Sequence, residues 1–155
     1  MNIIVAYDSI YGNTAKVAAA IATALEPDNS VRLVSVQQAR QTDLGTADLL
    51  IVGSPTRGFR PTPQISDLVA GLTPRSGGTA VAVFDTRIEP GAVRSGALRW
   101  VVEVGGYAGS RMDEMLRGRG YVRKSDIAGF LVAGMRGPLK PGEIDRAADW
   151  ARSLV

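Results

Sequence analysis

The sequence contains neither cysteine nor histidine among its 155 residues. Without cysteine the chain has no disulfide bond, no thiolate nucleophile and no thiolate metal ligand. Without histidine it lacks the side chain that most often serves as a general acid or base and often binds metals. Catalysis by either residue is therefore excluded, and we expect no metal site and no catalytic side chain.

The sequence also lacks long hydrophobic runs. The longest ones, such as residues 48–53 (DLLIVG) and 79–84 (TAVAVF), are far shorter than a membrane span. Met1 leads directly into a strand-like run, without the basic region that begins a signal peptide. We therefore expect no membrane span and a cytoplasmic location.

Charge of one sign is not concentrated anywhere in the chain. Lys and Arg number 18 and Asp and Glu number 15, which gives a net charge of +3. This excess is too small to indicate nucleic-acid binding, and no block of like charges forms a binding tail. We therefore expect no nucleic-acid partner.

What the chain does have is the length and apolar content of one domain, residues 1–155. Hydrophobic residues make up 45% of the sequence, enough for a sizeable core. Strand-like apolar runs occupy residues 2–7, 30–36, 47–53, 79–85 and 130–135. Helical periodicity occupies residues 15–25, 63–72, 91–106 and 141–155.

Two further details follow from these patterns. Thr62 and Pro63 are expected to be the N-cap and the first residue of the helix over 63–72. Trp100 and Trp150 lie on the apolar faces of their helices, so we expect both side chains in the core.

Strands that alternate with helices are typical of βαβ units, a parallel sheet and right-handed crossovers. The sequence therefore predicts an α/β fold, a doubly wound three-layer sandwich with five strands. Residues 111–129 do not fit the alternation, and they contain more basic than acidic residues. We interpret this segment as a basic insertion near the last strand, either a solvated excursion or a surface for a partner or a membrane.

A polar loop, Ser9–Thr14 (SIYGNT), separates the first strand from the first helix. In a doubly wound sheet, ligands bind beyond the carboxyl ends of the strands, where this loop lies. The helix start offers unpaired N–H groups and a partial positive charge, and the loop adds hydroxyl and amide donors. Gly12 lets the backbone bend toward a ligand. The loop therefore predicts a phosphate site, although Asn13 and Thr14 are also common in ordinary helix caps.

Two rival phosphate motifs are absent. The sequence contains no G-x-x-x-x-G-K-[ST] run, and no G-x-G-x-x-G run follows the first strand. A loop without a basic residue suits a phosphate held by neutral donors rather than a triphosphate with magnesium.

Residues 9–14 resemble the phosphate loop of flavodoxins, whose pattern is [ST]-x-[TY]-G-N-T after the first strand. Residues 53–61 (GSPTRGFRP) and 84–87 (FDTR) are similar to the second and third flavin loops of that family. Residues 137–151 resemble the tail of small bacterial and archaeal flavodoxin-like proteins, and an insertion near the fifth strand also marks long-chain flavodoxins.

The resemblance implies the strand order 2-1-3-4-5, the cofactor FMN and a redox partner protein. It also implies that three loops bind the cofactor. The first loop would hold the phosphate through Ser9, Ile10, Tyr11, Gly12, Asn13 and Thr14. The other two would border the ring through Ser54, Pro55, Thr56, Arg57, Gly58 and Phe59 on one side and Asp85, Thr86, Arg87 and Ile88 on the other.

Some of these residues have simpler interpretations. Phe59 stacks on the flavin or packs locally against Pro61 or Pro63. Arg57, Arg60 and Arg87 act on the ligand or are solvated surface residues, as most arginines are.

Three functions remain open from the sequence. The first is an FMN-binding electron carrier, which needs no histidine or cysteine because the cofactor does the chemistry. The second is an FMN-dependent reductase or oxidase for a quinone-like or porphyrin-like compound, similar to flavodoxin-like protoporphyrinogen oxidases. The third is a flavin-free interaction module.

Overall fold

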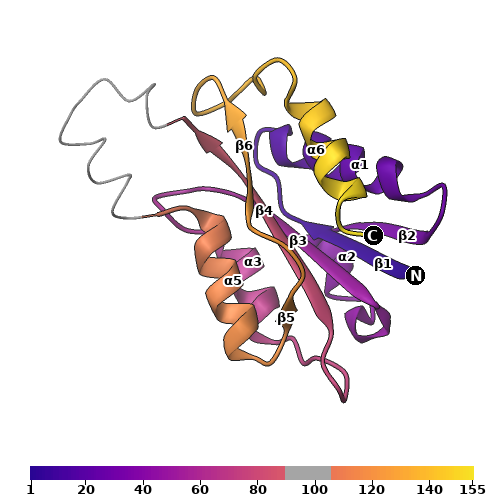
Figure 1. Ribbon diagram of the computed structural model, residues 1–155. Coiled ribbons are helices and arrows are strands. Elements are labelled where there is room, and N and C mark those ends of the chain that lie inside the picture. The colour runs from indigo at the N-terminus through magenta and orange to yellow at the C-terminus, as the bar shows by residue number, and fades with distance from the viewer. Residues whose placement is uncertain (90–105) are drawn as a thin grey trace.

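The computed structural model describes residues 1–89 and 106–155 (Figure 1). Its strands are β1 (Asn2–Tyr7), β2 (Ser30–Ser35), β3 (Leu49–Pro55), β4 (Ala80–Ile88), β5 (Val122–Arg123) and β6 (Ala128–Val132). Its helices are α1 (Asn13–Leu25), α2 (Val36–Ala39), the 3₁₀ helix η1 (Leu44–Thr46), α3 (Pro63–Ala70), α5 (Ala108–Gly118) and α6 (Glu143–Arg152). The helix expected over 91–106, with Trp100, lies outside the described residues.

The described strands form one six-stranded sheet in which every pair of neighbours is parallel. The order is β2-β1-β3-β4-β5, and β6 also pairs with β4. Val122 of β5 lies opposite Ala80 at the start of β4, whereas Val132 of β6 lies opposite Ile88 at its end. The predicted fold class and strand order are therefore confirmed, with the fifth position of the sheet filled by two short strands.

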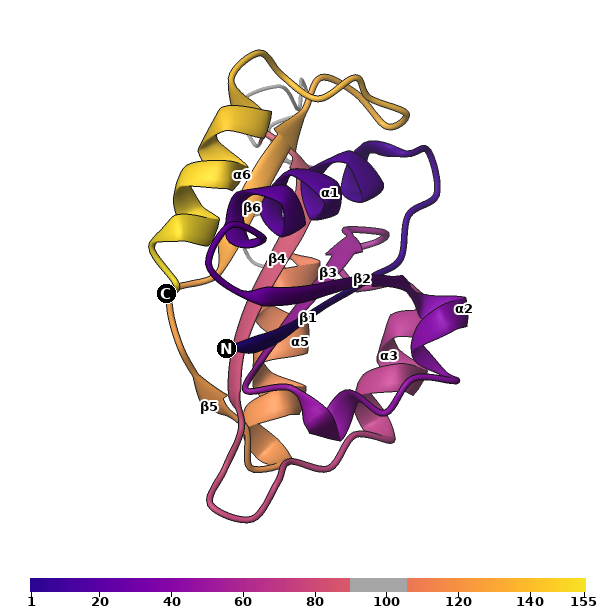
Figure 2. The ribbon, with the colours of Figure 1, turned by 90° about the vertical axis from the view of Figure 1, so that its right-hand side faces the viewer.

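Helices cover both faces of the sheet (Figures 1 and 2). Successive residues of a strand point to opposite faces, so the continuous apolar runs of β1 and β3 bury side chains on both. In β1, Ile3 and Val5 pack toward α1 and α6. Ile4 and Ala6 point to the other face and pack toward α3 and α5. This is the three-layer sandwich that the alternation of elements predicts.

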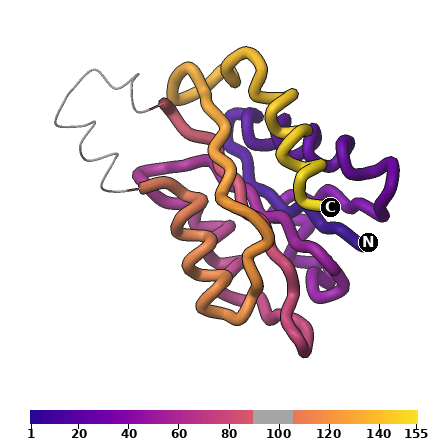
Figure 3. Tube along the Cα trace, in the orientation of Figure 1, coloured from indigo at the N-terminus to yellow at the C-terminus, as the bar shows by residue number. Residues whose placement is uncertain are grey.

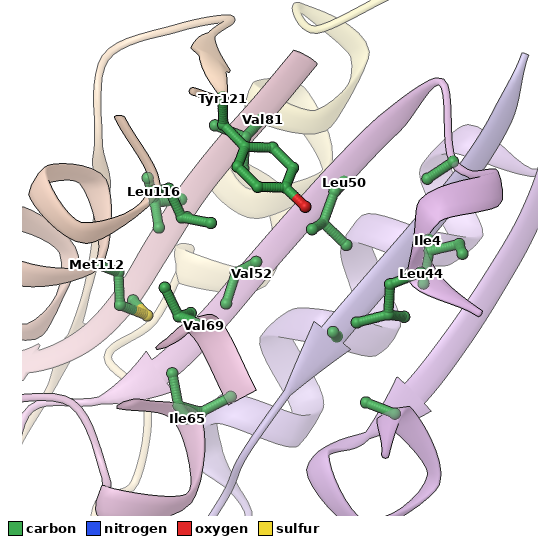
Figure 4. Packing of buried hydrophobic residues seen from close by; sticks show 14 of the residues in the cluster. Ile4, Leu44, Leu50, Val52, Ile65, Val69, Val81, Met112, Leu116 and Tyr121 are labelled. Carbon is green, nitrogen blue, oxygen red and sulfur yellow. The ribbon is translucent and has the colours of Figure 1, made fainter. Parts of the chain in front are cut away.

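One half of the core lies between the sheet and helices α3 and α5 (Figure 4). Ile65 of α3 and the α5 residues Met112 and Leu116 are fully buried there, against Leu50 and Val52 of β3. Helix α3 begins at Pro63 with Thr62 as its N-cap, as the sequence predicts. Its N-cap hydroxyl, on Thr62, accepts a hydrogen bond from the N–H of Ile65 at 3.3 Å.

The other half of the core contains a cluster of aromatic rings. The rings of Phe84, Phe130 and Trp150 meet edge to face, with centroids 6.1–6.2 Å apart. Phe84 and Phe130 are fully buried and Trp150 is half-buried at the margin of the cluster. Trp150 therefore packs against the core, as its helical position predicts.

The interpretation of residues 111–129 as an insertion is wrong. Residues 111–118 belong to α5, which buries Met112 and Leu116 against the sheet, and the buried Tyr121 and β5 follow. Arg111 and Arg117 lie on the exposed side of the same helix. The segment is amphipathic, and its exposed charges concealed a core-forming helix.

The last strand is also shifted relative to the expectation over 130–135. It begins at Ala128 and ends at Val132, and only residues 124–127 separate β5 from β6. Both chain termini lie close together, near the amino ends of the strands (Figure 3). The carboxyl ends of the strands lie at the opposite end of the sheet, where the loops that follow β1, β3 and β6 gather.

Candidate functional site

A cleft of about 380 Å³ lies at the carboxyl ends of β1, β3, β4 and β6. This volume falls within the usual range for small-molecule sites. The cleft is lined by Ile10, Tyr11, Asn13, Thr14, Pro55, Thr56, Arg57, Gly58, Thr86, Arg87, Ile88, Val132 and Met135. Its position is the one at which doubly wound sheets bind ligands.

The loop between β1 and α1 brings a helix start to this cleft. Gly12 is the N-cap residue of α1 and has φ = 92°, a left-handed conformation that glycine adopts readily. Its N–H and that of Ala15 both donate to the Ser9 hydroxyl oxygen, each at 3.2 Å. Gly12 has no side chain to cap α1, so Ser9 bonds the first turn instead, and within the described part of the chain that turn contains no acidic residue. The positive end of the helix is therefore free of competing carboxylates.

Side chains of this loop also tie the cleft together. The hydroxyls of Thr14 and Thr86 lie 2.8 Å apart and share a buried hydrogen bond between α1 and β4. The amide of Asn13 donates to the carbonyl of Arg136 at 3.2 Å, which links α1 to the loop after β6. A Cβ atom at Gly137 would lie 2.6 Å from the Asn13 side chain, so only glycine fits there.

The loop after β3 forms a tight two-residue hairpin. Arg57 and Arg60 exchange both backbone hydrogen bonds, N to O, at 2.8 and 3.1 Å. Between them, Gly58 and Phe59 both have positive φ, 53° and 66°. This conformation is costly for a phenylalanine, and strain of this kind gathers in ligand-binding loops. Ser54 is buried, and its oxygen accepts from the N–H of Thr62 at 3.0 Å.

A buried ion pair lies at the end of β4. Arg87 donates to both oxygens of Asp85, at 2.6 and 2.7 Å, and the N–H of Gly109 donates to the same carboxylate at 2.8 Å. The Arg87 guanidinium carbon lies 3.7 Å from the centroid of the Tyr107 ring. A Cβ atom at Gly129 would lie 2.4 Å from that same carbon, so the guanidinium occupies the space above this glycine.

This ion pair fixes Arg87 as part of the cleft wall. Burial raises the pKa of the Asp85 carboxyl, and the hydrogen bonds from Arg87 and Gly109 oppose the rise. The charge of Arg87 is therefore offset by the carboxylate two residues earlier.

Most of the residues predicted from the sequence line the cleft, and five do not. Those that line it are Ile10, Tyr11, Asn13, Thr14, Pro55, Thr56, Arg57, Gly58, Thr86, Arg87 and Ile88. Ser9, Gly12, Ser54, Phe59 and Asp85 are not among the lining residues. Four of these five support the wall through the bonds described above, and Phe59 lies in the strained hairpin.

The sequence did not point to four residues at the cleft. Val132 and Met135 line it from the end of β6 and the loop that follows. Arg136 reaches the ring of Tyr11, with its guanidinium carbon 5.7 Å from the centroid, and Tyr107 stacks on Arg87. The sequence feature that could have identified Val132, Met135 and Arg136 is the end of the last strand. In a parallel sheet, the loops that follow the strands all lie at this edge.

The lining side chains suit an anion. The set contains two arginines, three threonines and an asparagine, and no carboxylate. Within residues 1–89 and 106–155, no group of three carboxylates is placed to hold a metal ion. In the same residues, no helix has the length and apolar character needed to cross a membrane.

Comparisons with known proteins agree with this geometry. A family model described as a flavodoxin domain matches residues 4–85. An archaeal flavodoxin superposes with a TM-score of 0.75 at 22% identity, covering 99% of this chain and 96% of that one. Oxidised flavodoxin 1 from Bacillus cereus gives 0.73 at 17% identity, covering 99% and 97%.

A longer protein also contains this fold. Rubredoxin oxygen:oxidoreductase from Desulfovibrio gigas gives a TM-score of 0.70 at 17% identity, covering 99% of this chain and 35% of that one. No curated protein sequence matches the chain. At these identities the solved structures establish the fold, and the family model establishes the family.

Proposed function

The chain belongs to the flavodoxin family, and from this premise we propose that it binds FMN in the cleft and carries electrons between redox partners. The observation that supports the cofactor most directly is the start of α1. A helix start without acidic residues, the buried Thr14 hydroxyl and the Asn13 amide lie at a cleft that no carboxylate lines among the described residues. A phosphate monoester is the ligand that such a set of neutral donors suits.

In this proposal each loop has a separate task. Residues 9–14 hold the phosphate, through the N–H groups that begin α1 and the side chains of Ser9, Asn13 and Thr14. Residues 54–59 and 85–88 border the ring. Arg87 forms a rigid part of that border, because Asp85 and Tyr107 fix its guanidinium. FMN, when bound, supplies the redox centre.

The composition of the cleft favours an electron carrier over an enzyme that moves protons on a substrate. The described lining residues include no aspartate, glutamate or lysine, and the chain has no histidine or cysteine. General acid–base catalysis needs a group that titrates near neutral pH, which these side chains do not provide. Electron exchange through a bound ring needs no such group.

Titration with FMN and with riboflavin, followed by flavin fluorescence, tests the proposal. Wild-type protein is expected to bind FMN more tightly, because riboflavin has no phosphate. Thr14→Ala removes a hydroxyl that donates to a charged group, a contact worth about 1.5–3 kcal/mol. It should therefore lower the affinity for FMN by about tenfold or more.

Thr14→Ala also removes the hydrogen bond to Thr86, an effect that is the same for both ligands. The informative quantity is therefore the ratio of the two affinities, and Thr14→Ser is the matched control that should keep it. Equal losses for FMN and riboflavin would remove Thr14 from the phosphate site. A wild-type protein that binds neither flavin would contradict the cofactor itself.

A further inference from the structure

Two arginines flank one tyrosine at the mouth of the cleft. The guanidinium carbon of Arg57 lies 5.6 Å from the centroid of the Tyr11 ring, and that of Arg136 lies 5.7 Å from it. Arg57 comes from the hairpin after β3 and Arg136 from the loop after β6. The three loops that meet here belong to distant parts of the sequence, so the fold brings two positive charges together on one exposed ring.

These charges have no carboxylate partner in the described part of the chain. The ion pairs found there include neither Arg57 nor Arg136. The neighbouring basic residues are different, because Arg87 pairs with Asp85 and Lys140 pairs with Glu89. The net positive charge of the cleft mouth therefore comes from arginines whose side chains are exposed.

Apolar side chains are exposed between these arginines. Ile10 is 48% exposed, Tyr11 42% and Met135 72%. All three also line the cleft. Isolated exposed apolar residues are ordinary, but aromatic residues, methionine and arginine together are the composition that protein interfaces favour. We name this set of five residues the arginine rim: Ile10, Tyr11, Arg57, Met135 and Arg136.

We propose that the arginine rim is the docking surface for an acidic electron-transfer protein. The apolar centre of the rim would be buried on contact, and the two arginines would meet carboxylates on the partner. Complementary charge would also steer the partner toward the cleft, where electrons enter or leave. The electron-transfer role rests on the proposed function, whereas recognition of an acidic surface depends on the rim alone.

A second use of the arginines is to hold the cofactor's phosphate, and the geometry opposes it. Thr14, at the proposed phosphate site, is 1% exposed, whereas both arginines lie against a ring at the solvent-exposed mouth. The loop that leads into α1 provides neutral donors of its own. The arginines are therefore available to a partner.

Binding to two redox proteins of opposite charge tests the proposal. An acidic plant-type ferredoxin and the basic cytochrome c are each titrated into the protein by calorimetry, at low and at high ionic strength. Wild-type protein is expected to bind ferredoxin in preference, and more weakly at high salt, because screening reduces attraction between exposed charges. Arg136→Glu should weaken ferredoxin binding about tenfold, and the double variant with Arg57→Glu should lose the preference altogether.

Lys124→Glu is the matched control, because it changes the net charge equally at the other end of the sheet. Lys124 is exposed, and its N–H bonds to Val81 near the start of β4, far from the cleft. This variant should bind ferredoxin as wild type does. A similar loss in Lys124→Glu and Arg136→Glu would overturn the proposal, because net charge alone would then explain the binding. A wild-type preference for cytochrome c, or for neither protein, would overturn it as well.

Flavin titration of Arg136→Glu separates the remaining outcomes. A fall in FMN affinity without a fall in riboflavin affinity would assign Arg136 to the cofactor's phosphate and overturn the docking role. If wild-type protein binds no flavin but still prefers ferredoxin, the proposed function fails while the docking surface stands. The two proposals can therefore fail independently.

Discussion

Arg87, near the end of β4, has a side chain that is held in place by several contacts. Its guanidinium pairs with both oxygens of Asp85, rests on the Tyr107 ring and fills the space above Gly129. The Asp85 side chain is fully buried, whereas that of Arg87 is 20% exposed. Without Arg87, the buried carboxylate would keep the hydrogen bond from the N–H of Gly109 but would lose its charged partner.

We predict that Arg87→Ala destabilises the protein by about 3 kcal/mol, because breaking a buried ion pair by removing one partner leaves the other charge uncompensated. Urea unfolding, monitored by circular dichroism, measures the change. Arg57→Ala is the matched control, since Arg57 is exposed and has no ion pair within the described residues, and it should change stability by less than about 0.5 kcal/mol. Equal effects of the two variants would contradict this account.

At the scale of the element, α5 is the part of the chain whose role differs most from its appearance in the sequence. Five of its residues are buried, including Met112 and Leu116, one turn apart. The helix packs on the same sheet face as α3 and closes the half of the core that Figure 4 shows. Burial of this apolar face stabilises the sandwich, so α5 is not an appendage.

We predict that Leu116→Ala destabilises the protein by about 2–5 kcal/mol, the usual cost of a cavity left by a fully buried leucine. Arg111→Ala, on the exposed side of the same helix, should have little effect. Thermal or chemical unfolding compares the two. Replacing residues 111–129 by a short Gly–Ser link should abolish cooperative unfolding, and a folded, cooperative product would show that the sheet stands without α5.

Helix α6 is fastened to β6 by a buried carboxylate. Glu143 accepts hydrogen bonds from the Arg146 side chain at 2.6 and 3.0 Å and from the N–H of Leu131 at 2.6 Å. The bonds from Arg146 hold the pKa of Glu143 below its usual range, and the Leu131 N–H adds to this lowering while burial opposes it. The charged form is therefore favoured in the folded protein.

A lowered pKa in the folded state makes this contribution depend on pH. The stabilisation is fully present above the ordinary glutamate pKa of about 4.3 and is lost as the pH falls through the lower pKa of the folded protein. We predict that Glu143→Gln costs about 1.5–3 kcal/mol at neutral pH and that the difference from wild type shrinks below about pH 4. Urea unfolding across this pH range measures it. Glu114→Gln, at an exposed position of α5, should show neither effect, and a cost for Glu143→Gln that is independent of pH would refute the linkage.

At the scale of the whole molecule, the charge near the cleft is set by pairing rather than by counting arginines. Asp85 offsets Arg87 and Glu89 offsets Lys140, so among the described residues the positive charge at the mouth rests on Arg57 and Arg136. A nearby cation favours the electron-rich form of a bound flavin. For FMN bound as proposed, we therefore expect the reduction potential to depend on the arginine rim and not on Arg87.

We predict that Arg57→Glu lowers the reduction potential of bound FMN by about a few tens of millivolts. A unit charge about 8 Å away at an effective dielectric constant of about 20 contributes roughly 2 kcal/mol, and exposure to solvent reduces this. Potentiometric titration should show a larger shift at low salt. Lys124→Glu, at the other end of the sheet, should leave the potential nearly unchanged, and equal shifts in both variants would count against a local effect.

The sequence by itself determined the elements whose information is local. Continuous apolar runs such as residues 2–7 become buried strands, Thr62 caps the helix that Pro63 begins, and residues 9–14 form the turn into α1. These outcomes depend on neighbours within a few residues, which hydrophobic periodicity and capping preferences report. The alternation of strands and helices, together with the family resemblance, was then sufficient for the sheet order.

Only the tertiary structure decided the contacts between segments that are distant in sequence. It assigned the charged segment 111–129 to α5 and β5, brought Met135 and Arg136 to the cleft, and stacked Tyr107 on Arg87. The reason is physical. Parallel strands collect the loops that follow them at one edge, and which side chains meet there depends on strand order and register, which no local pattern encodes.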